Sequence, residues 1–336
     1  MARTKAARAN LKAWATRANL ADVAYGTSRG VSLIGDSVPI LKRASAKGLK
    51  GRVQLVFTSP PFPLNRKKKY GNRNGEDFKK WLASYAVLLR DLVTPDGSIV
   101  VEMWNAWEPG KPVMSTLALE SLLEFKRAAK LFLCQEFIWY NPARLPTPAQ
   151  WVTVERVRVK DAFTRLWWLS PTPKPKADNR RVLTPYSSSM RDLLKKKKYN
   201  SGRRPSEHAI GRRSFFSDNG GAIPPNVLTF GEENVPESVL AGSNTSSSDD
   251  YQRFCKRFDL EMHPARMPLN LAKFFIAMCT DAGDLVLDPF AGSNTTGAAA
   301  DQLKRKWMSI EADEDYANSG LGRFPRLAQH YRMPRS

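Results

Sequence analysis

Several residue types on which whole classes of proteins depend are scarce in this sequence of 336 residues. Its three cysteines, Cys134, Cys255 and Cys279, are far apart and odd in number, so they form neither a disulfide framework nor a zinc site. We expect all three to be buried structural thiols in a reducing cytoplasm. With only three histidines, metal ligands are also few, and we predict no metal site.

Long apolar stretches are missing as well. The longest, such as Leu131–Leu133, are far too short to span a bilayer. The N-terminus is basic, but it lacks the apolar core of about 7–15 residues that a secretory signal requires. We therefore expect neither a secretory signal nor a transmembrane segment.

Acidic residues are few relative to basic ones. The sequence has 53 lysines and arginines against 32 aspartates and glutamates, a net charge of +21. This excess is larger than solubility requires and favours a polyanionic partner. Nucleic acid is the first candidate, and an anionic membrane surface is the alternative. Residues 1–24 are predicted to form a basic, weakly amphipathic segment that is either a solvated flank or an arm on the polyanion.

More than half of this excess lies between residues 156 and 213, which hold 17 lysines and arginines and four acids. The segment is rich in proline and serine and contains Lys195, Lys196, Arg203 and Arg204, so we predict an irregular module that binds the polyanion. The alternative is a disordered tail. Aromatic and apolar residues that need burial argue against it, namely Trp167, Trp168, Tyr186, Phe215, Phe216 and Ile223. Residues 231–250 are predicted to form a mobile loop.

One short strand ends abruptly at two prolines. Apart from Gln54, residues 53–57 are apolar, β-branched or aromatic, and Pro60 and Pro61 cannot donate to a sheet ladder, so the strand must end before them. Ser59 and Pro60 leave hydroxyl and carbonyl oxygens as acceptors, with the aromatic ring of Phe62 beside them. Such a set suits a flat group that carries an NH2, and it predicts an active-site loop.

A basic loop follows this motif. Arg66, Lys67, Lys68 and Lys69 lie a few residues after the prolines. Four cations beside a catalytic loop could bind phosphate close to the chemistry, although a charge run is more often a solvated face. Because of its position we favour phosphate contact.

Strand and helix patterns alternate along the chain. Strands are predicted at residues 31–34, 98–102, 136–140 and 156–168, and helices at residues 78–92 and 117–133, with a turn at Asp96-Gly97. Alternation at this spacing predicts an α/β fold with crossover helices on a mostly parallel sheet. Asp36 follows the strand at 31–34, where it could serve a ligand or cap the next helix.

A second motif lies near the C-terminus. Residues 284–288 form a strand, residues 289–294 a tight turn with Gly292, and residues 295–300 the start of a helix of small residues. This arrangement is typical of nucleotide cradles in α/β folds. A dinucleotide fingerprint and a Walker loop are both absent, so phosphoryl transfer is not expected. Glu311 ends the next strand 23 residues after Asp288, where an acid can hold ribose hydroxyls.

Together the two motifs resemble those of the S-adenosylmethionine-dependent amino-methyltransferases of DNA. Residues 59–62, Ser-Pro-Pro-Phe, resemble the catalytic motif of this family, and residues 288–296, Asp-Pro-Phe-Ala-Gly-Ser-Asn-Thr-Thr, resemble its cofactor motif. The catalytic motif comes first and a basic region separates the two, as in the permuted β group. Serine at the first position suggests the N4 group of cytosine. The resemblance covers roughly residues 30–315.

The resemblance implies a Rossmann-like methyltransferase fold with circularly permuted motif order and S-adenosylmethionine as cofactor. The predicted division is a flank (1–24), a catalytic half (25–155), a basic target-recognition region (156–260), a cofactor-binding half (261–320) and a tail (321–336). The resemblance also implies cofactor contacts at Asp36, His263, Pro264, Arg266, Asp288, Phe290, Gly292, Ser293, Asn294, Thr295 and Glu311. The implied partner is double-stranded DNA, read at a short palindromic site, with a separately encoded restriction endonuclease.

The implied reaction is methyl transfer to the exocyclic amine of a flipped cytosine, with Ser59 and the Pro60 carbonyl as acceptors and Phe62 stacked on the base. Adenine N6 methylation is the alternative within the class, and a non-catalytic DNA-binding protein is the alternative outside it. Methylation at cytosine carbon 5 is excluded because no cysteine follows a proline. Zinc deamination is excluded because its histidine and cysteine signature is missing.

Overall fold

The computed structural model describes residues 10–61, 75–199, 202–203, 209–211, 215–229 and 250–331. Outside these ranges lie Phe62, Arg66, Lys67, Lys68, Lys69, Arg204 and residues 231–249 of the predicted loop. Arg203 is described in its backbone alone. No helix in the described ranges combines the length and the apolar character needed to cross a membrane.

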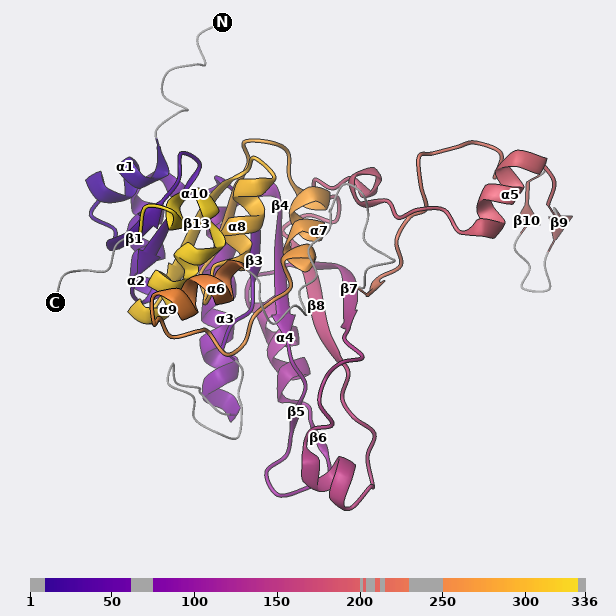
Figure 1. Cartoon of the computed structure of the whole chain (residues 1–336), viewed down its shortest axis with the longest axis horizontal. Helices are drawn as coiled ribbons and strands as arrows, with labels where there is room; N and C mark the ends of the chain where they lie inside the picture. Colours follow the sequence, from indigo (N-terminus) through magenta and orange to yellow (C-terminus); the bar gives the residue numbers. More distant parts are fainter. Residues whose placement is uncertain are drawn as a thin grey trace, which may run out of the picture.

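A nine-stranded mixed sheet forms the centre of the described part of the molecule (Figure 1). Strands β2, β13, β12, β3 and β4 are mutually parallel, while β1 is antiparallel to β2 and β8 is antiparallel to both β4 and β7. The strands, in their order across the sheet, are β1 (Asp22–Gly26), β2 (Gly30–Ile34), β13 (Lys306–Glu311), β12 (Leu285–Asp288), β3 (Val53–Thr58), β4 (Val93–Met103), β8 (Phe163–Ser170), β7 (Phe132–Tyr140) and β11 (Val227–Leu228).

Helices cover both faces of the sheet. The residues of α2, α3 and α4 pack into one apolar cluster and those of α7 and α8 into another. In chain order the helices are α1 (Leu11–Arg17), α2 (Ser37–Ala44), α3 (Gly75–Leu92), α4 (Leu117–Ala128), α5 (Ser188–Lys196), α6 (Asp250–Arg257), α7 (Leu269–Cys279), α8 (Thr295–Gln302), α9 (Glu314–Ser319) and α10 (Pro325–Ala328). The α/β architecture predicted from the alternating patterns is confirmed.

The strand β3 shows why the run at residues 53–57 had no polar face. Val53 and Val56 belong to the cluster under α2 and α3, whereas Leu55 and Phe57 belong to the cluster under α7. Side chains alternate between the faces of a strand, and both faces are covered here, so every position is apolar or otherwise buried. A central strand fully covered in this way fixes the position of the loop that follows it.

Strands β3 and β12 lie side by side in parallel although they are far apart in the chain. Leu55 pairs with Val286 and Val56 with Leu287. The carboxyl ends of parallel strands meet at one edge of the sheet, so this pairing brings the Ser-Pro-Pro loop next to the Asp288 loop. The sheet therefore joins the two motifs that the sequence keeps apart.

The helix predicted at residues 117–133 is shorter than expected. It ends at Ala128, and Phe132 and Leu133 already belong to β7. Lys130 has a left-handed backbone with φ of 51°, and the Leu131 amide bonds to the Lys126 carbonyl, an arrangement that terminates a helix. An apolar run could not reveal this end, because buried helix and strand residues look alike in sequence.

Two further predictions on strands need correction. The strand predicted at 156–168 spans Phe163–Ser170, since residues 156–162 are not extended in the sheet. The strand predicted at 98–102 spans Val93–Met103 and includes Asp96-Gly97, where its register with β3 shifts: Val53 pairs with Val93, and Leu55 pairs with Ser98. Two cysteines, Cys255 and Cys279, are buried as predicted, whereas Cys134 is only partly buried.

Several elements do not follow the predicted division into domains. The strand β1 runs across the boundary at residue 24, and Ala15 and Leu20 are fully buried, so the described part of the flank is packed on the body. The strand β8 belongs to the central sheet, and α6 packs against residues near α9. β8 and α6 were predicted to lie in the target-recognition region, and only the first residues of β1 in the flank.

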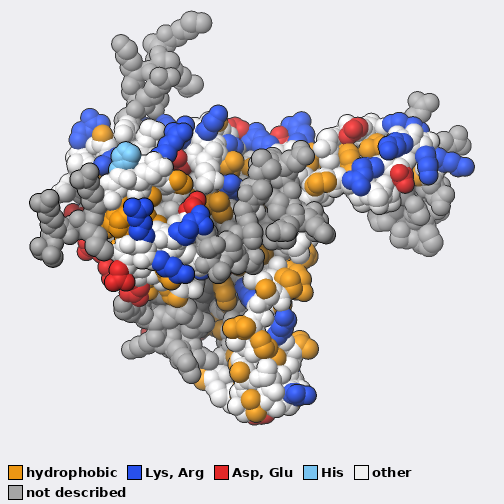
Figure 2. Space-filling model, in the orientation of Figure 1, with side chains coloured by type: hydrophobic (Ala, Val, Ile, Leu, Met, Phe, Trp, Pro, Cys, Tyr) orange, Lys and Arg blue, Asp and Glu red, His pale blue; other side chains and the backbone are white. Residues whose placement is uncertain are grey.

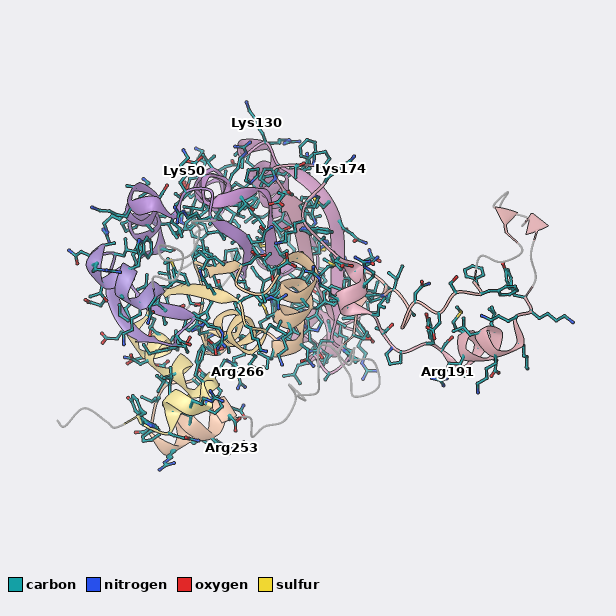
Figure 3. All side chains as sticks on the ribbon, turned by 90° about the horizontal axis from the view of Figure 1, so that it is seen from above. Lys50, Lys130, Lys174, Arg191, Arg253 and Arg266 are labelled. Atoms are coloured by element: carbon teal, nitrogen blue, oxygen red, sulfur yellow. The ribbon has the colours of Figure 1, made fainter. Side chains whose placement is uncertain are left out.

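A basic arm extends away from the body (Figures 1 and 2). We define the arm as the described residues between 184 and 222, whose base is closed by a bridge between Thr184 and Ala222. It carries α5 and a small ribbon of β9 (Gly202–Arg203) and β10 (Ala209–Ile210). Figure 3 shows Arg191 of the arm well apart from Arg266 on the body. The arm takes in the later part of the predicted basic module, from residue 184 onward, whereas β8 from its earlier part belongs to the central sheet.

The arm is stabilised by a small aromatic cluster. The ring of Tyr199 makes edge contacts with Phe215 and Phe216 at centroid distances of 5.2 and 5.3 Å, and Lys197 lies over the Phe216 ring. The expectation of burial holds for Trp167 but not for Phe215 and Ile223, which are 42% and 68% exposed.

A second projection carries the hairpin of β5 (Ala106–Trp107) and β6 (Met114–Ser115), together with residues near 150 (Figure 1). Apolar side chains gather on its surface in Figure 2. Among them Leu145, Val154 and Val159 are more than 60% exposed. This lobe continues directly from the carboxyl end of β4, so its base adjoins the edge of the sheet where the loops meet.

Candidate active site

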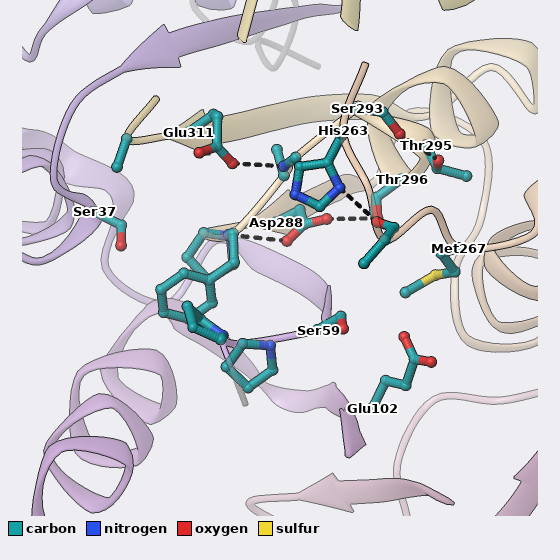
Figure 4. A pocket seen from close by; sticks show the side chains of 18 of the residues that line it. Ser37, Ser59, Glu102, His263, Met267, Asp288, Ser293, Thr295, Thr296 and Glu311 are labelled. Carbon is teal, nitrogen blue, oxygen red and sulfur yellow. Dashed lines mark hydrogen bonds between the residues drawn. The ribbon is translucent and has the colours of Figure 1, made fainter. Parts of the chain in front are cut away.

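A cavity of about 520 Å³ lies at the carboxyl ends of β2, β3, β4, β12 and β13 (Figure 4). Figure 4 shows Ser59 and Glu102 together at one end of it, and Glu311 and Ser37 toward the other. Parallel strands deliver their loops to this edge, which is where α/β folds bind ligands. The two ends of the cavity have different chemistry.

Asp288 ties the two motif loops together. Its carboxylate accepts hydrogen bonds from the Thr58 hydroxyl (2.9 Å), the Thr296 hydroxyl (2.7 Å) and the Phe290 amide (3.1 Å). These donors come from the end of β3, the first turn of α8 and the loop itself. Burial raises the pKa of Asp288 to about 6, and the Thr296, Phe290 and Thr58 hydrogen bonds partly oppose that rise.

The turn after Asp288 is held by Glu311. The Gly292 amide donates to one oxygen of Glu311 at 2.6 Å, and the Asp313 amide donates to the other at 3.0 Å. Each carboxylate oxygen keeps a further lone pair for a ligand. Burial raises the pKa of Glu311, and the two backbone hydrogen bonds oppose that rise.

Glycine is required at position 292 for two reasons. Its backbone is left-handed, with φ of 50°, and a β-carbon there would lie 3.1 Å from the imidazole ring of His263. His263 in turn packs edge-on against Tyr316, and its backbone amide donates to the Tyr251 hydroxyl at 2.9 Å. The histidine thus closes over the glycine turn.

Asn294 does not line the cavity, although it was predicted to contact the cofactor. Its side chain accepts from the Gly297 amide at 3.1 Å and from the Ser309 hydroxyl at 2.6 Å, and it donates to the Tyr25 hydroxyl at 2.8 Å. It therefore caps α8 and links that helix to β13 and β1. Pro264 is also absent from the cavity wall.

The end of the cavity near Ser37 has an aromatic wall. Phe290 packs against Tyr85 at 4.9 Å and against Trp81 at 5.6 Å, measured between ring centroids. The Ser37 and Tyr85 hydroxyls are hydrogen bonded. Asp36 lines the same region and also caps α2, since its carboxylate accepts from the Val38 amide at 2.9 Å. A flat ring bearing polar groups fits this wall.

The opposite end of the cavity holds Ser59 beside Glu102. Figure 4 shows the Glu102 carboxylate beside Ser59, whose hydroxyl favours its ionised form. Its Oε1 atom accepts a hydrogen bond from the Trp104 indole N–H at 3.2 Å. Glu102 is only 3% exposed, and burial raises its pKa to about 7, against the opposing effects of Ser59, Trp104 and Arg144. This carboxyl group can therefore exchange a proton near neutral pH.

Most of the predicted site residues that the structure describes meet in this cavity. The cavity wall includes Ser59, Pro60, Pro61, Asp36, His263, Arg266, Asp288, Phe290, Gly292, Ser293, Thr295 and Glu311. The predicted DNA-binding residues Lys195 and Lys196 lie elsewhere, exposed at the end of α5 on the arm.

Sequence reasoning missed Glu102 and the aromatic residues at the opposite end of the cavity. Glu102 is the last polar residue of a predicted strand, and β4 pairs in parallel with the strand that ends before Ser59. That adjacency is the signal that could have identified it, but only if the pairing of the two strands had been assumed. Trp81 and Tyr85 carried no signal, since aromatic residues at helical spacing are usually core residues.

Comparison with known proteins gives consistent results. A family described as DNA methylase matches residues 53–321. The chain is 41% identical to the type II methyltransferase M.PvuII of Proteus hauseri over 303 residues, 90% of this chain and 85% of that protein. It is 33% identical to DNA adenine methyltransferase YhdJ of Escherichia coli strain K12 over 159 residues, 45% of this chain and 53% of that protein.

Among solved structures, a PvuII DNA methyltransferase named cytosine-N4-specific matches with a TM-score of 0.70. The match covers 92% of this chain and 95% of that structure at 33% sequence identity. The predicted methyltransferase fold and the predicted resemblance are confirmed.

Proposed function

The chain belongs to the DNA methylase family, and from this premise we propose that it is a site-specific DNA methyltransferase that methylates the N4 amine of cytosine. One observation carries the proposal: the serine that precedes the two prolines lies beside a buried glutamate at one end of a nucleoside-sized cavity. The similarity to a methyltransferase named cytosine-N4-specific supports the choice of base.

S-adenosylmethionine supplies an electrophilic methyl group when it is bound. We assign its ribose hydroxyls to Glu311 and its adenine to the aromatic wall of Trp81, Tyr85 and Phe290. Its methionine end is assigned to the His263 and Arg266 side of the glycine turn. The free lone pairs of Glu311 and the flat aromatic wall are the features that fit these groups.

The exocyclic nitrogen of cytosine is a weak nucleophile because its lone pair is delocalised into the ring. In the proposed reaction the Ser59 hydroxyl donates to Glu102, whose ionised form it favours, so the lone pairs on Oγ remain free to accept one N–H of the target amine. The Pro60 carbonyl accepts the other N–H. Two acceptors on the amine oppose the delocalisation and orient the nitrogen lone pair toward the methyl group.

The methylated nitrogen must then lose one proton. We propose that this proton passes to Ser59 Oγ while the Ser59 hydroxyl proton passes to Glu102, which ends the step as a neutral carboxylic acid. Ser59 is regenerated, and Glu102 releases the proton to solvent before the next turnover. A carboxyl group with a pKa of about 7 can take part in both steps.

Double-stranded DNA reaches this cavity only if the target base leaves the duplex, which costs a few kcal/mol. Phosphate contacts by basic residues, including Lys195 and Lys196 on the arm, offset this cost. We propose a short palindromic recognition site, a separately encoded restriction endonuclease with the same specificity, and a cytoplasmic location. The similarity to a type II methyltransferase supports these proposals.

The test is incubation with duplex DNA and labelled S-adenosylmethionine, followed by digestion to nucleosides and identification of the labelled base by mass. We expect N4-methylcytosine. Labelled N6-methyladenine would replace the cytosine assignment by the activity named for YhdJ. Binding of DNA without any incorporation would reject methyl transfer and favour a binding protein.

A further inference from the structure

We infer that Trp104 is a positioning residue for Glu102, and that Arg144 holds Trp104 in place. This inference rests on the proposed function, in which Glu102 receives a proton through Ser59. Neither residue belongs to the two motifs from which the function was predicted. Each comes from a segment that leads into the lobe of β5 and β6, whose base adjoins the edge of the sheet where the loops meet.

Trp104 directly follows β4, whose last residues include Glu102. Two residues apart, the indole N–H reaches back to Oε1 of Glu102 at 3.2 Å, and the Trp104 side chain also forms part of the cavity wall. An indole N–H can only donate, so it fixes one carboxylate oxygen as an acceptor. The carboxylate is thereby held in one orientation relative to Ser59.

Arg144 holds the indole from one side. Its guanidinium carbon lies 4.1 Å from the centroid of the Trp104 ring and 5.6 Å from that of Trp139, which also lines the cavity. The same guanidinium donates to the Phe163 carbonyl at 2.9 Å and to the Thr164 hydroxyl. Because these hydrogen bonds anchor Arg144 to β8, its planar guanidinium group keeps a fixed position against the rings of Trp104 and Trp139.

The charged and polar groups around Glu102 come from four elements. Ser59 after β3, Trp104 after β4 and Arg144 after β7 all favour the ionised carboxylate, whereas Asp288 of β12 disfavours it by like charge. Burial disfavours ionisation most strongly. Trp104 and Arg144 therefore do more than pack: they offset part of the cost of keeping a buried carboxylate ready to accept a proton.

The substitution Trp104→Phe removes the N–H donor and keeps an aromatic ring under Arg144. We expect kcat to fall by about 10-fold or more at neutral pH, since a hydrogen bond to a charged group is lost. We also expect the midpoint of the kcat versus pH profile to move to higher pH, because the ionised form of Glu102 loses a donor. KM for DNA and for S-adenosylmethionine should change little.

Trp107→Phe is the matched control, because it makes the same chemical change in the neighbouring hairpin and Trp107 does not line the cavity. It should leave the pH midpoint unchanged. Arg144→Lys is a second variant, which keeps the positive charge but loses the planar guanidinium group. It should lower kcat and shift the midpoint of the kcat versus pH profile upward by less than Trp104→Phe does.

An unmoved midpoint in Trp104→Phe would overturn the positioning role, even if kcat fell, because simple packing loss lowers the rate equally at all pH values. If that variant fails to fold, an unmoved midpoint in Arg144→Lys has the same consequence. Failure of the proposed function looks different: the unaltered protein itself would then form no N4-methylcytosine.

Discussion

The cavity and the arm differ in how deeply their side chains are buried. Around the cavity, residues such as Glu102, Asp288 and Thr296 are less than 5% exposed, and the hydrogen bond from Thr58 to Asp288 joins segments that are 230 residues apart in the chain. On the arm, Gly221 is the one buried residue among those whose exposure the structure describes. Its lysines at 195 and 196 project from a helix that buries none of its own residues.

This difference in burial suits the two regions to different tasks, chemistry on a base at the cavity and phosphate binding on the arm. Chemistry on a base requires a few groups held in fixed positions, which burial and hydrogen bonds provide. Binding to phosphates requires charge at the surface, where a small aromatic cluster is enough support. Changes at the cavity should therefore affect the rate and stability, whereas changes on the arm should affect DNA affinity and its dependence on salt.

The largest expected effect is at Glu102. Glu102→Gln cannot take up the proton from Ser59, so kcat should fall by about 10²–10⁴-fold. In the unaltered enzyme the rate should rise with pH through about 7, because Glu102 must be ionised to accept the proton, and this rise should vanish in the variant. Methyl-transfer rates measured between pH 5.5 and 9 check both points.

Glu108→Gln, which makes the same change on the lobe next to β5, is the control for this variant and should behave like the unaltered enzyme. Near-normal kcat in Glu102→Gln would remove the glutamate from the reaction and leave Ser59 as a simple acceptor.

The second effect concerns stability. Thr296→Val should lower the free energy of unfolding by about 1–3 kcal/mol, because one oxygen of buried Asp288 loses its hydroxyl donor. The pKa of Asp288 in the folded state is already raised to about 6, so its ionised form is disfavoured by folding, and losing the donor raises it further. The loss of stability should thus be larger at pH 8 than at pH 5.

Thr295→Val is the matched control for that experiment, since Thr295 is equally buried but makes only a 3.4 Å contact with Ser293. Urea denaturation at the two pH values provides the measurement. Equal losses at pH 5 and pH 8 would mean that Asp288 does not depend on Thr296.

A smaller effect is expected at the other end of the cavity. Glu311→Gln should raise KM for S-adenosylmethionine by about 10-fold, since one acceptor for ribose hydroxyls becomes a weaker, uncharged one. DNA affinity should not change. Glu314→Gln, on the exposed start of α9, is the control. Unchanged binding of S-adenosylmethionine in calorimetry would place the ribose elsewhere.

The smallest effect on the reaction is expected on the arm. The pair Lys195→Ala and Lys196→Ala should leave kcat unaltered, weaken DNA binding several-fold and reduce the slope of log affinity against log salt by about 2. The control is the pair Lys130→Ala and Lys174→Ala, exposed lysines that Figure 3 shows on the body, away from the arm. An identical slope in the two double variants would mean that the arm makes no phosphate contacts.

The predictions from sequence succeeded where a residue's neighbours in the chain settle its role. The strand before Ser59 ends at prolines, and the loop after Asp288 turns at a glycine, whatever the rest of the chain does. They were less accurate where the role depends on distant neighbours. Asn294 sits in the cofactor motif but caps a helix, and the end of the helix after Leu117 depends on a left-handed backbone at Lys130.

By itself, the sequence determined the two motif loops, the alternation of strands and helices, and the concentration of basic residues in the segment that includes the arm. These features follow from local rules, since proline, glycine, side-chain periodicity and charge act over a few residues. The tertiary structure decided which strands are neighbours. Pairing β3 with β12 and β4 brought Ser59 within reach of Glu102 and Trp104, and no local pattern contains that information, because it arises from how both faces of the sheet are buried.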